Sequence, residues 1–355
     1  MKKFIALLLS LCMMLTLVAC GSNKQSTTDS TQIAATVSQN ETSAATEAAT
    51  SANDNEIVAP DGYPGDTVTM IVSYAAGAGS DLLARALAQY IDFGDETMVC
   101  TNITGGSGTI GMMECYHAEP DGLTMCLALP ESYAVQILNG SLEDDLFDNL
   151  IMVASPVYDV DTVSVRADSP YTNLEELLAY AKEHPGEVTV AGVGSGLNKW
   201  MVIDLMQKTG VEFKYVPYSD ANETRAAVLG GQADVLFSQA CESKPYYDSK
   251  ELTVLAVAAD ERVSFMNDVP TFKEEGYEFV AGIHRGFAVT PGTPDEIVDY
   301  LEAKIQEVYD NPEFIDYMNN TLGFNTVWTG HDAYEALSRE LVDTFKPLLE
   351  VAGNY

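Results

Sequence analysis

Short β-branched runs alternate with longer segments of helical periodicity from about residue 63 onward. The first run, residues 68–74, predicts a strand, and the apolar positions after it repeat at the spacing of a helix through residue 91. The same order of strand, loop and helix recurs along the chain. Further strands are predicted over 98–103, 124–129 and 188–191, and further helices over 109–117 and 198–208. This alternation predicts an α/β fold with largely parallel sheets.

Glycine-containing loops join these strands to the helices that follow them. They cover residues 74–81, 104–108 and 192–196. Ser80 is predicted as the N-cap of the first helix, and Asp81 lies in its first turn, where the helix dipole favours an acid. Free amides at a helix start, together with the dipole, favour anion binding. Three such loops converging predict a site for an acidic ligand.

A fourth loop is expected at 131–133, after the strand predicted over 124–129. The sequence gives it no glycine and places Pro130 directly before it. We therefore expect a proline turn that leads from the strand into this loop.

The first nineteen residues have the pattern of a secretory signal. Lys2 and Lys3 precede an uncharged apolar stretch over 4–19, and small residues lead to Cys20. The stretch is shorter than the ~20 residues that span a bilayer. Leu17-Val18-Ala19-Cys20 resembles the lipobox of bacterial lipoproteins. This resemblance implies that residues 1–19 are removed and that Cys20 carries acyl chains that anchor the protein outside the cytoplasm.

Residues 20–59 are expected to form a tether, because they are mostly Ser, Thr, Ala, Asn and Gln with few large apolar residues. The whole chain has 18 basic and 53 acidic residues, and the predicted signal contains two lysines and no acid. The mature chain therefore has 16 basic residues, and its net charge is −37. Nucleic acid and anionic lipid are poor partners for such a surface.

Four cysteines remain in the folded part: Cys100, Cys115, Cys126 and Cys241. Their spacing is not that of a metal site or a C-x-x-C motif. Most of them fall in apolar periodic segments, which favours buried thiols. An extracytoplasmic location also permits a disulfide among them.

Residues 106–111 match the dinucleotide fingerprint G-x-G-x-x-G and follow a predicted strand. The ribose-binding acid of that motif belongs at the end of the next strand, which here ends in Leu129-Pro130, and Glu131 comes only after the proline. Nicotinamide cofactors are also scarce outside the cell. We therefore expect no cofactor.

Catalytic signatures are missing as well. Ser195 stands in Gly-Val-Gly-Ser-Gly, which does not fit the nucleophile elbow G-x-S-x-G, and no H-E-x-x-H motif occurs. Four scattered histidines supply little general acid or base material, and His117, His184 and His331 are expected at helix ends or on the surface. No enzyme and no metal site are predicted.

Several motifs resemble the substrate-binding proteins of tripartite tricarboxylate transporters, also called the Bug family. The opening segment is Tyr63-Pro64 followed by residues 68–81 and by Ala84-Arg85-Ala86-Leu87-Ala88. The other matches, in family order, are residues 106–111, 120–124, 216–218, 229–235, 268–271 and 291–294. Together they extend from residue 63 to the C-terminus.

The resemblance implies a two-lobed, periplasmic-binding-protein-like fold of type II with two crossover strands. Lobe 1 is expected over 60–164 plus 284–355, and lobe 2 over 165–283. It further implies a monomer that closes on a small carboxylate of the di- or tricarboxylate class and delivers it to a permease of one large and one small integral membrane subunit. A receptor that signals to a kinase remains the alternative.

The resemblance also carries ligand-site residues to this chain. Amides of the first loop would meet one ligand carboxylate, the second loop would face it, and Ser238-Gln239 replace the more usual Asp-Asn. The residues so implied are Tyr74, Ala75, Gly79, Ser80, Asp81, Ser107, Gly108, Thr109, Ser132, Ser195, Asn198, Tyr218, Ser238 and Gln239.

Two cations are further candidates for ligand contact. Arg285, beside His284 at the second expected crossover, suits a bidentate clamp on a carboxylate, with a hinge role or a surface pairing with a protein acid as the alternative. Lys199 is either a surface lysine or a ligand contact. Asp81 also has a simpler interpretation as a helix cap. Citrate, a C4 dicarboxylate, an acidic amino acid or an aromatic carboxylate all fit this pattern.

Overall fold

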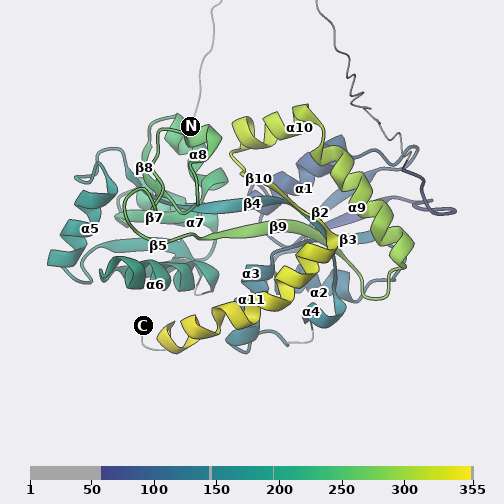
Figure 1. Ribbon diagram of the computed structural model, residues 1–355, viewed down its shortest axis with the longest axis horizontal. Coiled ribbons are helices and arrows are strands. Elements are labelled where there is room, and N and C mark those ends of the chain that lie inside the picture. Colours follow the sequence, from purple (N-terminus) through teal and green to yellow (C-terminus); the bar gives the residue numbers. More distant parts are fainter. Residues whose placement is uncertain (1–56, 144–145, 195, 353–355) are drawn as a thin grey trace, which may run out of the picture. The chain divides into compact units, whose positions relative to one another are not determined.

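The computed structural model describes residues 57–143, 146–194 and 196–352 (Figure 1). The predicted signal, nearly all of the predicted tether, Cys20 and Ser195 lie outside these residues. The described residues belong to one compact unit. No described helix is long and apolar enough to cross a bilayer.

A parallel three-stranded arrangement forms the start of the fold. It consists of β1 (Val68–Val72), α1 (Gly79–Tyr90), β2 (Met98–Asn102), α2 (Thr109–Tyr116) and β3 (Thr124–Ala128). β1 pairs with both other strands, in the order β2-β1-β3. The predicted elements are confirmed, with strand ends one or two residues earlier than expected. The carboxyl ends of three parallel strands thus meet at one sheet edge, where their loops gather.

One predicted loop is wrong. Residues 131–133 lie in the first turn of α3 (Pro130–Leu138), not in a turn between elements. Pro130 occupies the first helical position, where its fixed φ and missing N–H favour helix initiation. The short α4 (Leu146–Asn149) and the sixteen-residue β4 (Ile151–Arg166) follow.

The second half repeats the topology of the first. Its elements are α5 (Leu174–Glu183), β5 (Thr189–Val193), α6 (Leu197–Thr209), β6 (Lys214–Tyr218), α7 (Ala221–Leu229), β7 (Val235–Gln239), α8 (Ala240–Asp248) and β8 (Leu252–Val257). β5 lies between β6 and β7, parallel to both, as β1 lies between β2 and β3. The strand predicted over 188–191 is shifted by one residue and longer, so Gly192 belongs to β5 rather than to the loop.

Two long strands connect these halves. β4 pairs with β9 (Gly282–Val289) over residues 151–160 and with β7 and β8 over residues 161–166. β9 in turn pairs with β3. In Figure 1, β4 and β9 run side by side. The expected two crossover strands are therefore confirmed, while the exact lobe boundaries stay a prediction.

The chain ends in α9 (Asp295–Tyr309), α10 (Pro312–Asp316), β10 (Thr326–Thr329) and α11 (His331–Ala352). β10 pairs with β4. His331 is the first residue of α11, and His117 and His184 are the C-caps of α2 and α5, which confirms the expectation for these histidines.

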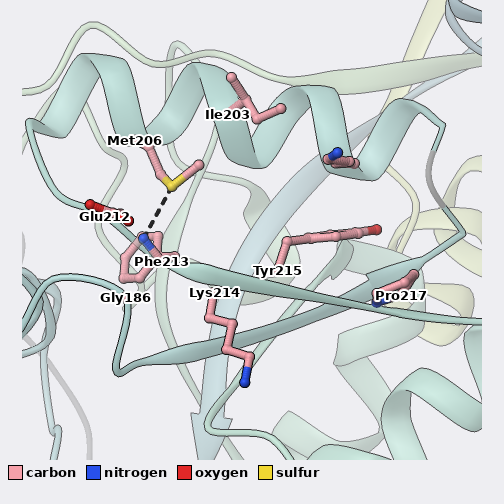
Figure 2. Close-up of a pocket in the computed structure, with 9 residues that line it drawn as sticks. Gly186, Ile203, Met206, Glu212, Phe213, Lys214, Tyr215 and Pro217 are labelled. Carbon is pink, nitrogen blue, oxygen red and sulfur yellow. Dashed lines mark hydrogen bonds between the residues drawn. The ribbon is translucent and has the colours of Figure 1, made fainter. Parts of the chain in front are cut away.

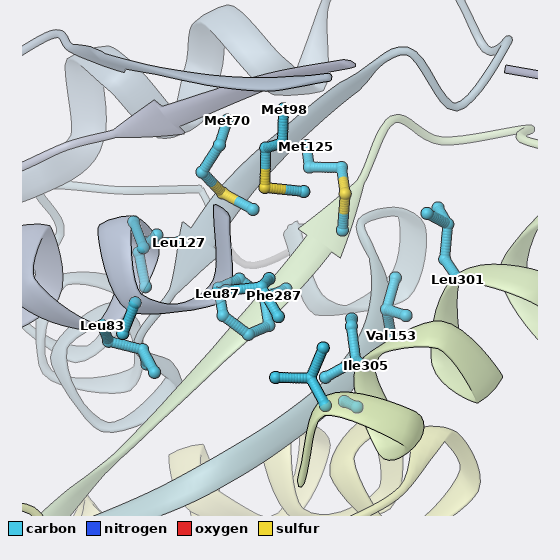
Figure 3. Close-up of a cluster of buried hydrophobic side chains, with 14 of the residues drawn as sticks. Met70, Leu83, Leu87, Met98, Met125, Leu127, Val153, Phe287, Leu301 and Ile305 are labelled. Carbon is cyan, nitrogen blue, oxygen red and sulfur yellow. The ribbon is translucent and has the colours of Figure 1, made fainter. Parts of the chain in front are cut away.

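Separate apolar cores stabilise the two halves. The first gathers residues of β1, β2, β3, α1, α9 and β9, and Figure 3 shows Met70, Met98, Met125 and Phe287 among its side chains. The second packs α5 and α6 against β5 and β7, with Trp200 and Phe237 buried. Met side chains adapt to irregular gaps between strands and helices. Each half therefore has its own core, and β4 contributes to both.

Candidate functional site

The first glycine loop is held by Asp81. One carboxylate oxygen of Asp81 accepts hydrogen bonds from the Gly77 amide and Arg85 Nε, both at 2.9 Å, and the other accepts from Asn102 Nδ2 at 2.9 Å. Burial acts to raise the pKa of Asp81, but these three donors outweigh it and lower the pKa. Asn102 also donates to the Tyr74 carbonyl at 3.0 Å. Asp81 therefore shapes the loop with both of its oxygens.

The predicted capping role of Ser80 is wrong. α1 begins at Gly79, and its N-cap Ala78 makes no side-chain cap. Ser80 is already helical and buried, and its hydroxyl accepts a hydrogen bond from Arg285 Nη1 at 2.9 Å. The capping position precedes the first helical residue, and Ser80 is already the second residue of α1, so its hydroxyl is available to contact the crossover strand.

The second loop is a compact turn of positive-φ residues before α2. Ser107 has φ 56° and Gly108 has φ 98°. Tyr74 from the first loop packs onto this turn, and its hydroxyl donates to the Ser107 carbonyl at 3.2 Å. A Cβ atom on Gly108 would lie 2.7 Å from that hydroxyl oxygen. Only glycine fits both the backbone conformation and the contact with Tyr74.

Ser132 and Gln136 of α3 complete this group. Ser132 hydrogen-bonds the Tyr74 hydroxyl; burial raises the pKa of Tyr74, while this bond and the charge of Arg285 act to lower it. Gln136 donates from Nε2 to the Ser107 carbonyl at 3.3 Å and accepts from the Thr109 hydroxyl. The first loop, the second loop and the start of α3 thus lie against one another.

The third loop belongs to the second half of the fold. The Gly194 amide donates to the Tyr218 carbonyl at 2.8 Å, and the Tyr215 hydroxyl donates to the Gly194 carbonyl at 2.9 Å. Asn198 lies in the first turn of α6 and is half-buried. No described contact joins Asn198 or Tyr218 to Tyr74 and its neighbours, so the third loop is a separate part of the predicted site.

Ser238 and Gln239 have internal partners at the end of β7. The Ser238 hydroxyl is 2.9 Å from the Ser243 hydroxyl, which is 2.7 Å from that of Thr162. Gln239 donates from Nε2 to Asp161 Oδ1 at 2.7 Å. Gln239 is thus held by an acid on the neighbouring strand β4.

Arg285 lies 5% exposed and contacts a protein carboxylate. Its Nε donates to Asp159 Oδ2 at 2.9 Å. Cys241 Sγ donates to the same oxygen at 3.1 Å. A Cβ atom on Gly79 would lie 2.8 Å from Arg285 Nη2 and 2.9 Å from Cys241 Sγ. The starts of α1 and α8 and both crossover strands therefore meet around this guanidinium.

A second carboxylate, Glu242, enters the same region from α8. It lies 3.5 Å from Arg225 Nη1, with both side chains about one-tenth exposed. Burial raises the pKa of Glu242, while the charges of Arg285 and Arg225 and a hydrogen bond from the Gly79 amide act to lower it. The anion site predicted at the start of α1 thus holds a carboxylate of the protein itself.

Asp161 is a third buried acid here. Burial raises its pKa from 3.8 to about 7, and the negative charges of Asp159 and Glu242 add to this effect. The hydrogen bond from Gln239 and the charge of Arg285 act in the opposite direction. The region therefore combines three carboxylates with two guanidinium groups.

Glu131 and His284 form another buried pair. His284 donates its backbone amide to one Glu131 oxygen at 3.1 Å, and its Nδ1 is 2.6 Å from the other. The Tyr158 ring lies 4.7 Å from the imidazole, centre to centre. This pair fixes the start of α3, and with it Ser132, to the crossover strand β9.

Lys199 lines a groove between α6 and β6. The groove has a volume of about 360 Å³, and none of the other predicted ligand residues lines it. Figure 2 shows Met206 and Phe213 at this groove, where the Phe213 amide donates to Met206 Sδ at 3.1 Å. The groove that Lys199 lines therefore includes no residue of the glycine loops of the first half.

The structure brings many of the predicted residues together: Tyr74, Gly79, Ser80, Ser107, Gly108, Thr109, Ser132 and Arg285. Sequence reasoning missed Asp159, Asp161, Arg225 and Glu242. The alternation of Asp159 and Asp161 with valines in a long apolar strand was a usable signal, because a charge at an inward strand position is rare without a function or a partner.

Two amides of the first loop, those of Gly77 and Gly79, donate to carboxylates of the protein, so this backbone suits an oxyanion. Among the described residues, no group of three or more His, Cys, Asp or Glu side chains is arranged to hold a metal. Cys100, Cys115, Cys126 and Cys241 are free thiols, and all but the half-buried Cys100 are buried.

A family model described as the tripartite tricarboxylate transporter family receptor matches residues 83–353. Protein BugT of Bordetella pertussis is 29% identical over 265 residues, which cover 73% of this chain and 81% of BugT. A TctC solute-binding protein from Polaromonas, solved without ligand, has 29% identity and a TM-score of 0.64, covering 81% of this chain and 99% of that one.

An R. palustris protein solved with adipate has the same fold. Its TM-score is 0.75 at 21% identity, and the match covers 82% of this chain and 98% of that one. The family match extends from α1 to the last helix and so includes both crossover strands. The chain therefore belongs to the tripartite tricarboxylate transporter receptor family, a family of solute-binding proteins.

Proposed function

We propose that this protein captures a small carboxylate outside the cytoplasm. The observation that carries the proposal is the contact between the two glycine loops and α3, where Tyr74, Ser107, Gly108 and Ser132 meet beside Arg285. Hydrogen-bond donors in a site that is shielded from water bind a carboxylate strongly. Each hydrogen bond to a charged group contributes ~1.5 to 3 kcal/mol to the free energy of binding. The adipate bound by the R. palustris neighbour supports this ligand class.

The receptor works without a catalytic residue in this proposal. It delivers its ligand to a permease of one large and one small membrane subunit, and closure of 60–164 plus 284–355 onto 165–283 retains the ligand until delivery. β4 and β9 are suited to act as the hinge, because they are the long strands that belong to both halves.

The direct test is to identify the ligand that co-purifies with the protein. Denaturation is expected to release a small carboxylate, which mass spectrometry identifies. The protein should leave this carboxylate chemically unchanged after long incubation. Adding the carboxylate back to the ligand-free protein should make the protein more compact in solution scattering. Release of a non-acidic molecule, turnover of the acid, or an unchanged scattering profile at saturation would contradict the proposal.

Gly108→Ala is expected to weaken binding of the co-purified carboxylate by about tenfold or more. The new methyl group would lie 2.7 Å from the Tyr74 hydroxyl oxygen, at a backbone φ of 98° that costs a non-glycine residue roughly 1–2 kcal/mol. Calorimetric titration measures the effect. Gly140→Ala is the matched control, because Gly140 also has positive φ but a Cβ atom there would meet nothing within 4 Å. Equal affinity in both variants would remove the second loop from the ligand site.

Cys20→Ala is expected to abolish acylation and leave the folded region intact. Acyl transfer needs the thiol of the cysteine that follows Leu17-Val18-Ala19. The variant should be released from the membrane or retained as uncleaved precursor. Labelling of cells with radioactive fatty acid checks this, and incorporation of label into the variant would rule out Cys20 as the anchor.

A further inference from the structure

A charged cluster lies where five elements meet. It consists of Asp159 on β4, Arg225 on α7, Glu242 on α8 and Arg285 on β9, packed against the start of α1 at Gly79. The acids and the arginines are nearly inaccessible, since their side chains are between 0% and 10% exposed. Buried charges are costly unless they are paired, so each charge in the cluster must be matched by another.

Glu242 fills a niche that is built for an anion. The Gly79 amide, Arg225 and Arg285 surround its carboxylate with donors and positive charge. The niche has no spare room on the side of Arg285, because even a methyl group on Gly79 would lie within 3 Å of Arg285 Nη2 and Cys241 Sγ. A ligand carboxylate could enter this anion niche only by displacing Glu242.

We propose that Glu242 is a specificity-determining residue that takes the position of a ligand carboxylate at the start of α1. This inference rests on the proposed function of the same site. Because Glu242 is already there, the receptor selects against ligands that bring a second carboxylate to this end and prefers ligands with one carboxylate and an uncharged or cationic far end.

The charge balance of the region supports this selection. Asp159 and Glu242 already match the guanidinium groups of Arg225 and Arg285. A further carboxylate would be an unmatched negative charge in a buried site. Juxtaposed like charges repel one another, so the far end of a dicarboxylate is repelled.

Removal of the Glu242 side chain tests the niche without knowledge of the natural ligand. Glu242→Ala leaves a carboxylate-sized space lined by Gly79, Arg225 and Arg285, and added acetate is expected to fill it. Acetate should therefore raise the melting temperature of this variant saturably, whereas potassium chloride of equal ionic strength should not. The wild type and Glu183→Ala, which removes an exposed glutamate at the end of α5, should not respond.

Adipate and hexanoate test the consequence for selection, because they differ only in a terminal carboxylate. The wild type is expected to bind adipate no more tightly than hexanoate. In Glu242→Ala the affinity for adipate relative to hexanoate should rise by at least about tenfold. Calorimetric titration of both proteins with both acids measures the change.

The outcomes separate this inference from the proposed function. A wild type that binds adipate at least tenfold more tightly than hexanoate, or an acetate response equal in wild type and variant, overturns the role of Glu242 while carboxylate capture stands. If Glu242→Ala folds only when acetate is present, the inference is supported. If neither Glu242→Ala nor Glu242→Ser can be recovered folded in saturating acetate, the inference is overturned.

Discussion

Asp161→Asn is expected to stabilise the protein above pH 7 by up to about 4 kcal/mol and to leave its stability below pH 4 nearly unchanged. Burial raises the pKa of Asp161 from 3.8 to about 7, and each unit of such a shift corresponds to ~1.4 kcal/mol. The asparagine keeps an oxygen that can accept the hydrogen bond from Gln239. It has no charge to bury at any pH.

The direction follows from proton linkage. Between about pH 4 and 7, Asp161 keeps its proton in the folded protein, whereas the unfolded chain releases it. The contribution of the protonated Asp161 to the stability of the folded state is therefore fully present below pH 4. This contribution is lost as the pH rises from about 4 to 7, and above 7 the wild type bears the full cost of the buried charge. The free energy of unfolding of the wild type should therefore fall as the pH rises over this range, and this fall should be absent in Asp161→Asn.

Urea denaturation at a series of pH values checks this result. Asp299→Asn in α9 is the control, because Asp299 is exposed and its replacement should leave the pH profile as it is. Identical profiles for wild type and Asp161→Asn would mean that Asp161 stays ionised and well solvated throughout.

Arg285→Met is expected to destabilise the protein by roughly 3–5 kcal/mol, the cost of leaving one partner of a buried ion pair alone. The guanidinium holds Asp159 at 2.9 Å and Ser80 at 2.9 Å, and the side chains of the ion pair are 6% and 0% exposed. Burial already raises the pKa of Asp159 with Arg285 in place. Without it, the charge of this carboxylate has no counter-ion within contact distance.

A double-mutant cycle with Asp159→Asn isolates the pair. The combined variant should recover much of the lost stability, because no uncompensated charge then remains in the cluster. Arg262→Met is the matched control, since Arg262 pairs with Glu274 at 2.8 Å on the surface and its loss should matter little. Simple additivity of the two single changes would show that Arg285 and Asp159 are not coupled.

The α/β class, the order of the first strands and helices, and the glycine loops could be predicted from the sequence. Local pattern suffices for these, because a strand of Val and Ile followed by a glycine and a periodic apolar helix is specified by neighbours in the chain. The predicted loop at 131–133 was wrong for a local reason also, since Pro130 begins a helix rather than a turn. The role of Ser80 was wrong because α1 begins one residue before it.

The two crossover strands and the ligand-site residues came from the resemblance to a family rather than from periodicity. The structure confirms the crossovers and brings Tyr74, Gly108 and Ser132 together from three separate loops and helices. Arg285 was singled out as a candidate clamp on a ligand carboxylate, and the structure pairs it with Asp159, on a strand more than a hundred residues earlier.

The sequence by itself determined the class of fold, the acidic surface, the expected lipid anchor at Cys20 and the loops that offer amides to an anion. Only the tertiary structure decided which charges face one another. Asp159, Glu242 and Arg285 lie far apart along the chain, and their pairing depends on how β4 and β9 cross between the halves. Since the cost of a buried charge depends on its neighbours in space, no pattern along the chain could predict that Glu242 occupies the start of α1.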